Sequence, residues 1–369
     1  MKINSNKENL LKGIQVIQSA LSGRTTLPIL HNFLAETDNG KLKLVKTDLE
    51  MATTHFINAD IAEPGSVTIP LKEFSDILQS MPSGQEISIN TDASNKVHIK
   101  CKSSKFWVMG TPKDEYPLVP DMDKSEMIQI PAQVIQKLIQ KTIFAASTQE
   151  TRYVLNGLSW GFFKKGIEVV ATDGRRLAVA SYDTVKSVRE FKIVVPSKIL
   201  HEVTRFIGIE KPEAGEIMTV GVSSNQVGFR MSGTTFISKL IDGNFPNYEQ
   251  VVPTKKDVSF TVSCKELLDT TKRAALCVSD RGGVVKYTLK NGVIMVSASS
   301  QKMEMNDEVP VDYKGHDMQI SFNPAYIVDI FKNMAAEKAV FSLTNPLNPV
   351  LVEPVGDAGS KYVVMPVKS

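Results

Sequence analysis

The chain of 369 residues has few cysteines and no long apolar stretch. Its three cysteines, Cys101, Cys264 and Cys277, are too few and too scattered for a disulfide framework or a zinc site, so reduced intracellular thiols are expected. No run approaches the length of a membrane span, and the N-terminal stretch MKINSNKENLLKGIQ lacks the apolar core of a secretory signal. These absences predict a soluble, cytoplasmic protein.

A strong charge of either sign is also lacking. The 43 Lys and Arg residues nearly balance the 40 Asp and Glu residues, which leaves a formal net charge of +3. Such a balance does not by itself indicate a nucleic-acid-binding protein. Any basic surface must therefore arise from segregation of charge.

Catalytic sequence motifs are absent as well. The chain contains no HExxH, GxGxxG, GxxxxGK[ST] or GxSxG pattern, and its five histidines are never at metal-ligand spacing. We therefore expect no catalytic residue, no metal site and no cofactor.

What the sequence does contain is a long internal repeat. The segment LVKTDLEMA aligns with VVATDGRRLA, so that Thr47 and Asp48 fall on Thr172 and Asp173, 125 residues later. A weaker third copy at 281–300 keeps the strand–turn–strand pattern but loses the Thr-Asp pair. A period this long exceeds that of solenoid repeats and predicts whole domains in tandem.

The copies begin with segments of helical periodicity, at 5–21, 131–147 and 263–279. In the first segment four apolar residues share one helical face: Leu10, Ile14, Ile17 and Leu21. A second helix in each copy is expected to start at a proline: Pro70, Pro196 and Pro324.

Two of the first helices carry the pattern of a capping box, in which a hydroxyl and a carboxylate satisfy each other's backbone N–H groups. The pairs are Ser5 with Glu8 and Ser263 with Glu266, and Pro131 suits the first turn of the remaining helix. Each first helix also carries at least two basic residues, which favour either a solvated face or a shared electrostatic surface: Lys7, Lys12, Lys137, Lys141, Lys265, Lys272 and Arg273.

The segments between the helices alternate apolar and polar residues around turn residues, as antiparallel hairpins do. The predicted fold is therefore α+β: three tandem domains, each with two helices packed on antiparallel sheets. The expected boundaries are 1–125, 126–253 and 254–369.

The stretch ATDGRRLAVA admits two interpretations. Asp173 could be a general base beside Arg175 and Arg176, which would make the chain an enzyme of unknown type. Asp48, however, occupies the same place in the first copy without those arginines, and this favours an Asx-type turn. Gly174 would then adopt easily a backbone conformation that Leu49 must also reach.

Several phrases together resemble the bacterial DNA polymerase III beta subunit family, the sliding clamps. They are GRTTLPIL (23–30), KTDLEM (46–51), RYVLNG (152–157), ATDGRRLAV (171–179), SKLIDGNFPNY (238–248) and YVVMPV (362–367). The resemblance covers the whole chain. It implies three similar domains, a head-to-tail homodimeric ring with pseudo-sixfold symmetry, and a non-catalytic processivity factor. The implied partners are duplex DNA bound without sequence specificity, DNA polymerase III, the clamp loader, and other polymerases and repair proteins.

The resemblance also implies residues that contact DNA. The positions that match the family are Arg24, Gln149, Arg152, Tyr153 and Lys198, and Lys72 stands near a family arginine and keeps its charge. Val154, Ser197 and Gln250 replace residues that are usually tyrosine or arginine, which implies a looser hold on DNA at those points.

A pocket for short peptides rich in Gln, Leu and Phe is implied between the second and third domains. The matching positions are Leu155, Thr172, Gly174, Arg175, Arg176, Leu177, Pro246, Val251, Asn323, Tyr326, Val363, Val364, Met365 and Pro366. Arg175 stands where histidine is common, Pro349 replaces a small polar residue, and the loop at 278–285 is short. These departures imply a shifted partner preference.

For the dimer, the resemblance implies that the strand 105–108 of one chain meets the helix 274–277 of the other. Phe106 and Leu276 would be apolar anchors, and Val108 lies on the same strand. Charged partners are expected between two groups: Lys100, Lys102 and Lys105 on one side, and Glu304, Asp307 and Glu308 on the other. A repetitive β-rich scaffold unrelated to DNA is the remaining alternative.

Overall fold

The computed structural model describes residues 1–18, 27–122, 126–183, 189–278 and 283–368. The chain forms two compact units. The first unit holds residues 1–133 and 198–240, and the second holds residues 134–197 and 241–369. No helix in the described ranges is long and apolar enough to cross a membrane.

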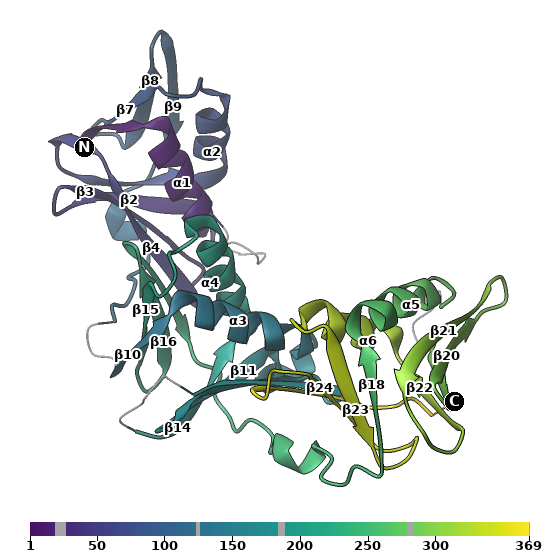
Figure 1. Ribbon diagram of the computed structural model, residues 1–369. Coiled ribbons are helices and arrows are strands. Elements are labelled where there is room, and N and C mark those ends of the chain that lie inside the picture. Colours follow the sequence, from purple (N-terminus) through teal and green to yellow (C-terminus); the bar gives the residue numbers. More distant parts are fainter. Residues whose placement is uncertain (19–26, 123–125, 184–188, 279–282, 369) are drawn as a thin grey trace. The chain divides into compact units, whose positions relative to one another are not determined.

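The first unit contains two antiparallel sheets (Figure 1). The five-stranded sheet has the order β5 (Asp60–Glu63), β1 (Lys2–Asn6), β7 (Glu86–Thr91), β8 (Lys96–Cys101) and β9 (Ser104–Met109). The eight-stranded sheet has the order β10 (Glu126–Pro131), β15 (Ile217–Val222), β16 (Gln226–Met231), β17 (Thr234–Lys239), β4 (Met51–Asn58), β3 (Lys41–Thr47), β2 (Asn32–Asp38) and β6 (Ser66–Pro70).

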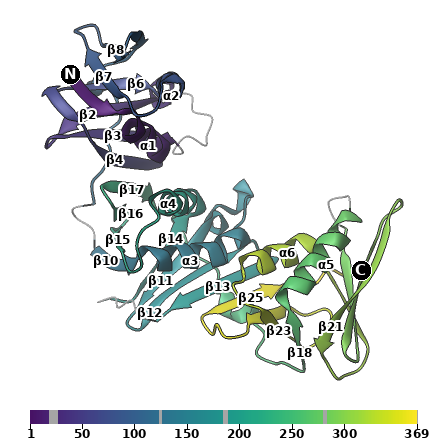
Figure 2. The same ribbon diagram turned by 45° about the horizontal axis from the view of Figure 1, so that its top comes forward.

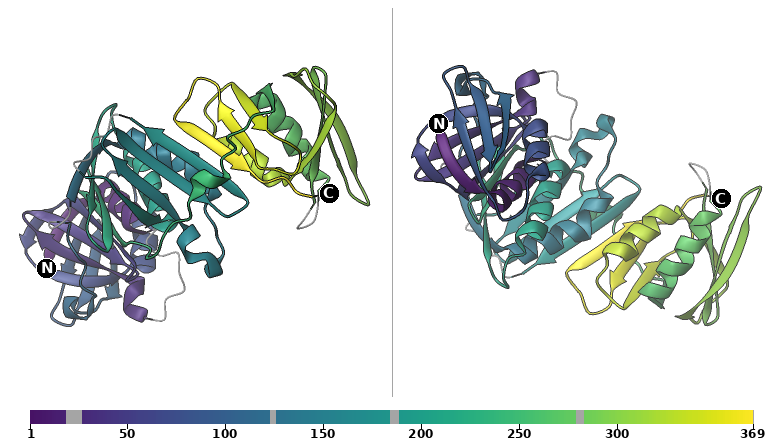
Figure 3. Two further views of the ribbon diagram at one scale, coloured as in Figure 1. Left: turned by 90° about the horizontal axis from the view of Figure 1, so that it is seen from below. Right: turned by 90° about the horizontal axis from the view of Figure 1, so that it is seen from above.

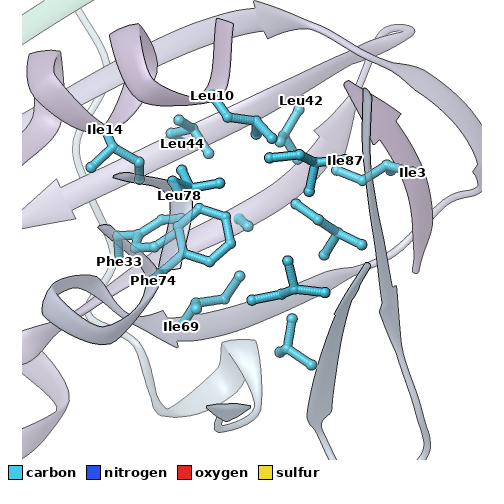
Figure 4. Close-up of a cluster of buried hydrophobic side chains, with 14 of the residues drawn as sticks. Ile3, Leu10, Ile14, Phe33, Leu42, Leu44, Ile69, Phe74, Leu78 and Ile87 are labelled. Carbon is cyan, nitrogen blue, oxygen red and sulfur yellow. The ribbon is translucent and has the colours of Figure 1, made fainter. Parts of the chain in front are cut away.

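Helices cover these sheets in the first unit. Helix α1 (Lys7–Gln18) packs against α2 (Leu71–Ser80) and on strands β3 and β4 (Figure 2). Most of α4 (Ser197–Glu210) also belongs to this unit. Leu10, Ile14 and Ile17 are at most 1% exposed and enter one apolar core with Phe33 and Phe74, as Figure 4 shows for most of its members. The predicted apolar face of α1 is thus confirmed for these three; Leu21 lies outside the described residues.

The second unit is built on one twelve-stranded antiparallel sheet. Its order is β14 (Phe191–Pro196), β11 (Gly157–Phe163), β12 (Gly166–Thr172), β13 (Arg176–Tyr182), β25 (Ser360–Val364), β24 (Val350–Pro354), β23 (Lys338–Leu343), β18 (Val258–Ser263), β21 (Glu304–Asp312), β20 (Val293–Ser299), β19 (Val285–Lys290) and β22 (Met318–Phe322). Helices α5 (Cys264–Leu276) and α6 (Pro324–Asn333) pack side by side against its strands (Figure 3). Helix α3 (Ala132–Thr142) lies mostly in this unit.

The internal repeat of the sequence is a structural repeat. Strands β2, β3 and β4 recur as β11, β12 and β13, and the first residues of each pair are 125 positions apart. In register, Thr47 lies opposite Ala52 and Thr172 lies opposite Leu177. The third copy keeps the predicted strand–turn–strand pattern as β19 and β20.

The helix starts agree only partly with the predicted caps. Ser263 caps α5 as expected, accepting from the Glu266 backbone N–H. The Ser5–Glu8 capping box is wrong. Ser5 donates to the Asn58 carbonyl, and Asn6 accepts from the Glu8 N–H at 2.8 Å instead. Ser5 is part of strand β1, which extends to Asn6. The residue that caps α1 is therefore Asn6, one position after the predicted one.

The eight-stranded and the twelve-stranded sheet each join segments that are far apart in the sequence. In the first unit, β17 pairs with β4 and places Thr234 opposite His55. The His55 ring Nδ1 lies 2.7 Å from the Thr234 hydroxyl, and the residue is 5% exposed. Burial, with a smaller contribution from Lys12, lowers the pKa of His55 to about 4.

The buried histidine makes the first unit sensitive to acid. Because its pKa is about 4 in the fold, against an ordinary value of 6.5, the unfolded chain binds the proton first as pH falls. Stability should therefore decline from pH 6.5 toward pH 4, by up to about 3 kcal/mol from this residue. Urea unfolding across this pH range should show a flatter profile for His55→Gln. His201→Gln, at an exposed position on α4, is the matched control and should follow the parent chain. Equal profiles for all three proteins would contradict the assignment of this acid sensitivity to His55.

Candidate functional site

The turn between β12 and β13 is held by Thr172 and Asp173. The Thr172 hydroxyl donates to the Arg176 carbonyl at 2.6 Å and accepts from the Gly174 N–H at 3.0 Å. The Asp173 carboxylate accepts from the backbone N–H groups of Arg175 and Arg176, at 2.8 and 3.0 Å. Asp173 is therefore an Asx-turn residue, as the repeat predicted.

The turn between β3 and β4 has the same construction. The Thr47 hydroxyl donates to the Met51 carbonyl, and Asp48 accepts from the N–H groups of Glu50 and Met51. Leu49 has a φ of 77° and Gly174 a φ of 83°, so both occupy the left-handed region. The prediction that Leu49 reaches the conformation of the glycine is confirmed.

The Arg176 side chain, next to the turn between β12 and β13, is held by four groups. Its Nε lies 3.1 Å from Asp173, and its Nη1 lies 2.6 Å from Asp329 on α6. The guanidinium carbon also stands 4.8 Å from the Tyr326 ring centroid and 5.5 Å from that of Phe144. Two carboxylates compensate this charge, so Arg176 acts here as a structural tie between the turn and α6.

The last strand of the chain completes the site. Strand β25 pairs with β13, with Leu177 opposite Val363 and Arg176 opposite Val364. Beyond the strand, the Met365 N–H donates to the Arg175 carbonyl at 2.9 Å. Side chains from two distant segments thereby face the same space.

That space is an open cavity of about 550 Å³, the first groove. Ten of the predicted peptide-pocket residues line it: Leu155, Thr172, Gly174, Arg175, Arg176, Leu177, Pro246, Val251, Val363 and Met365. Its exposed apolar groups include Val251 and Met365, at 46% and 38% exposure. A largely apolar groove with a few polar groups is suited to holding apolar side chains of a ligand.

Four predicted residues do not line the first groove, although each lies near its structural frame. Val364 is fully buried under the strand pair, and Tyr326 stacks on Arg176. Asn323 caps α6 by accepting from the Ala325 N–H at 2.9 Å, and Pro366 follows Met365.

Sequence reasoning missed two lining residues, Asn247 and Tyr248. Both lie in the segment FPNYEQVVP, whose likeness to YPLVP gave the only signal. The Tyr248 hydroxyl donates to Glu168, and burial raises the pKa of Tyr248 well above its usual range. This bond ties the segment to strand β12.

The predicted DNA-contact residues occur in both units. Arg24 lies outside the described residues. Lys72 is exposed near the start of α2, whereas Lys198 forms an ion pair with Asp48. Lys198 is thus partly neutralised by its own chain.

In the second unit the other three predicted contacts lie close in sequence. Gln149 is exposed, and Tyr153 is 58% exposed. The Arg152 Nη1 donates to the Asp173 carbonyl at 2.8 Å, which connects this segment to the turn of the first groove. Because its partner is a neutral carbonyl, Arg152 keeps its full charge.

Most basic residues of the first helices make contacts within their own unit. Lys7 is buried and donates to the Met81 carbonyl. Four others pair with acids: Lys12 with Glu210, Lys141 with Asp357, Lys272 with Asp269, and Arg273 with Asp307. Among the described residues no acid pairs with Lys137 or Lys265, both exposed.

The predicted dimer residues on β9 and α5 differ in exposure. Phe106 and Leu276 are 40% and 70% exposed, but Val108 is 8% exposed and packs in the core of the first unit. Val108 lies on the same face of β9 as Phe106, opposite Val97 of β8, and the core of the first unit covers its side chain. Trp107 is 57% exposed on this strand.

The charged dimer residues lie on strand edges. Lys105 is exposed directly opposite Lys100, and Glu304 is exposed at the start of β21. Asp307 already pairs with Arg273, which holds the pKa of Asp307 below its usual value.

Within the part of the chain that the structure describes, no three His, Cys, Asp or Glu residues converge to hold a metal ion. Residues 279–282 of the short loop at 278–285 lie outside the described residues.

Comparison with known proteins identifies the family. Models of the DNA polymerase III beta subunit match the N-terminal domain at 1–120, the central domain at 129–247 and the C-terminal domain at 249–368. The beta sliding clamp of Proteus mirabilis is 32% identical over 371 residues and covers 100% of both chains.

Solved structures agree. The DnaN sliding clamp of Pseudomonas aeruginosa bound to griselimycin has a TM-score of 0.93 at 30% identity, with 100% of both chains covered. The sliding clamp of Bacillus subtilis has a TM-score of 0.94 at 27% identity, covering 100% of this chain and 99% of that one. The chain, with its three tandem clamp domains, belongs to the DNA polymerase III beta subunit family, the non-catalytic DNA sliding clamps of bacterial replication.

Proposed function

We propose that two copies of this chain join head to tail into a ring around duplex DNA in the cytoplasm, and that the first groove holds partner proteins there. The partners are the DNA polymerase III catalytic subunit, the clamp loader, and other polymerases and repair proteins. The domains that form the ring are 1–125, 126–253 and 254–369. The observation that carries the proposal is the apolar first groove in a chain of the sliding clamp family.

A closed ring holds DNA by topology, so it needs few phosphate contacts. This agrees with the net charge of +3 and with the pairing of three of the six lysines of the first helices with acids. Few contacts release few counterions, which permits sliding without sequence preference. Arg152 and Lys72 remain available for such contacts.

The dimer proposal rests on two strand edges. Strand β9 is the outer strand of its sheet, and the first half of β21 pairs only with β20 among the described residues. Lys100 and Lys105 stand opposite each other on β8 and β9, a destabilising arrangement unless an acid approaches. Glu304 and Glu308 on the β21 of a second copy supply that charge.

A test of the ring is the topology of the DNA. Protein loaded on a nicked circle should remain bound at high salt and be released when the circle is cut, because only an end allows escape. Gel filtration of labelled protein with the DNA measures this retention. Linear DNA with both ends blocked is the matched control and should retain the protein. Equal loss from circular and open linear DNA would disprove encirclement.

The first groove can be tested with a fluorescein-labelled peptide, Gln-Leu-Ala-Leu-Phe. Met365→Ala removes an exposed apolar wall and should weaken binding by about fivefold, close to 1 kcal/mol. Fluorescence anisotropy provides the dissociation constants. Met303→Ala, at an exposed methionine outside the groove, should bind like the parent chain. Equal affinity of the two variants would mean that the peptide binds elsewhere.

The dimer contact can be tested by charge reversal. Lys105→Glu should raise the dimer dissociation constant by about tenfold, since it places like charges together. Sedimentation velocity measures the change. Glu304→Lys in the same chain should restore assembly, whereas Lys165→Glu, at an exposed turn between β11 and β12, should have no effect. An unchanged dimer in Lys105→Glu would contradict the pairing.

A further inference from the structure

The structural repeat produces a second groove, in the first unit. There β17 pairs with β4 as β25 pairs with β13, so that Ala52 lies opposite Ile237 where Leu177 lies opposite Val363. The Lys239 N–H donates to the Glu50 carbonyl at 3.0 Å, matching the 2.9 Å bond from Met365 to Arg175. The backbone frame of the first groove is thus present twice.

A cavity occupies the same place in this second frame. Its volume is about 530 Å³, close to the 550 Å³ of the first groove. Thr47, Leu49, Met51, Ala52 and Ile237 line it from the sheet, and Leu118 lines it from the segment YPLVP. That segment takes the part that Pro246 to Val251 take in the first groove.

The second groove combines apolar side chains with polar ones, and it carries no net charge. Leu49 is 45% exposed, and Leu118 is 99% exposed. The two charged side chains of the rim, Glu50 and Lys239, lie 3.1 Å apart and compensate each other. The remaining polar side chains of the lining, Thr47 and Gln226, are uncharged. An uncharged segment that offers apolar side chains to Leu49 and Leu118 therefore suits this cavity.

The backbone of Leu49 supplies an independent indication. A leucine at a φ of 77° is strained, whereas the glycine of the other copy adopts this conformation without cost. Glycine and asparagine are the residues that adopt this conformation most readily. Here the strained backbone holds a half-exposed apolar side chain at the edge of a cavity.

We propose that the second groove is a binding site for a short, uncharged linear peptide segment of another protein, which inserts Leu or Phe side chains between Leu49 and Leu118. The proposal rests on the proposed function of the first groove for the class of ligand. The two sites differ in their rims, because Glu50 and Lys239 replace Arg175 and Met365. The second site should therefore bind more weakly and without charge preference.

The test is the stoichiometry of the peptide Gln-Leu-Ala-Leu-Phe on the full chain, measured by isothermal titration calorimetry. The parent chain should bind two equivalents, one strongly and one weakly. Leu49→Gly should remove the weak event, raising its dissociation constant by at least about tenfold, and leave the strong event unchanged. Because glycine relieves the strained φ, this variant should fold as well as the parent. Leu347→Ala, at an exposed leucine outside both grooves, is the control.

A second variant separates the two proposals. Val251→Arg places a charged side chain at the exposed edge of the first groove and should remove only the strong event. A single equivalent in the parent chain, or a weak event unaffected by Leu49→Gly, would overturn the second site. A strong event that survives Val251→Arg would instead overturn the assignment of the first groove.

Discussion

Antiparallel pairing between strands of different repeats is the interaction on which the structure depends. Strand β13 finds its partner in β25, nearly two hundred positions later, and β4 finds its partner in β17. Each pairing merges the sheets of neighbouring copies into one. It also brings a turn against a distant strand end, and a groove forms where the two meet.

This pairing explains why the compact units do not follow the repeat. The eight-stranded sheet contains strands of the first and second copies, and the twelve-stranded sheet contains strands of the second and third. Main-chain hydrogen bonds need no particular side chains. The joined sheets can therefore tolerate great divergence between copies, as the weak third repeat shows.

Much of the fold could be predicted because its causes are local. The Thr-Asp turn and the proline-led helices follow from short-range preferences, and the 125-residue spacing made the turn visible twice. The resemblance to the family supplied most of the groove. Ser5 was misjudged because its role depends on tertiary structure: Ser5 bonds to Asn58 across the fold. The burial of the Val108 side chain in the core of the first unit is a tertiary effect of the same kind. The neutralisation of Lys12 by Glu210 was equally invisible, since almost two hundred residues separate them.

In the turn, Thr172 and Asp173 make the hydrogen bonds that define its shape, and Thr47 and Asp48 do the same in the other copy. To the hydrogen bonds of Thr172 and Asp173, and of Thr47 and Asp48, the three positions that follow contribute backbone groups and, in the turn between β12 and β13, also the Arg176 Nε. The turn between β3 and β4 therefore carries Leu49, Glu50 and Met51, and the turn between β12 and β13 carries Gly174, Arg175 and Arg176, in the same backbone conformation. Because the turn-forming Thr and Asp residues are separate from these three positions, single substitutions there can alter which ligand is recognised while the backbone of the turn stays the same.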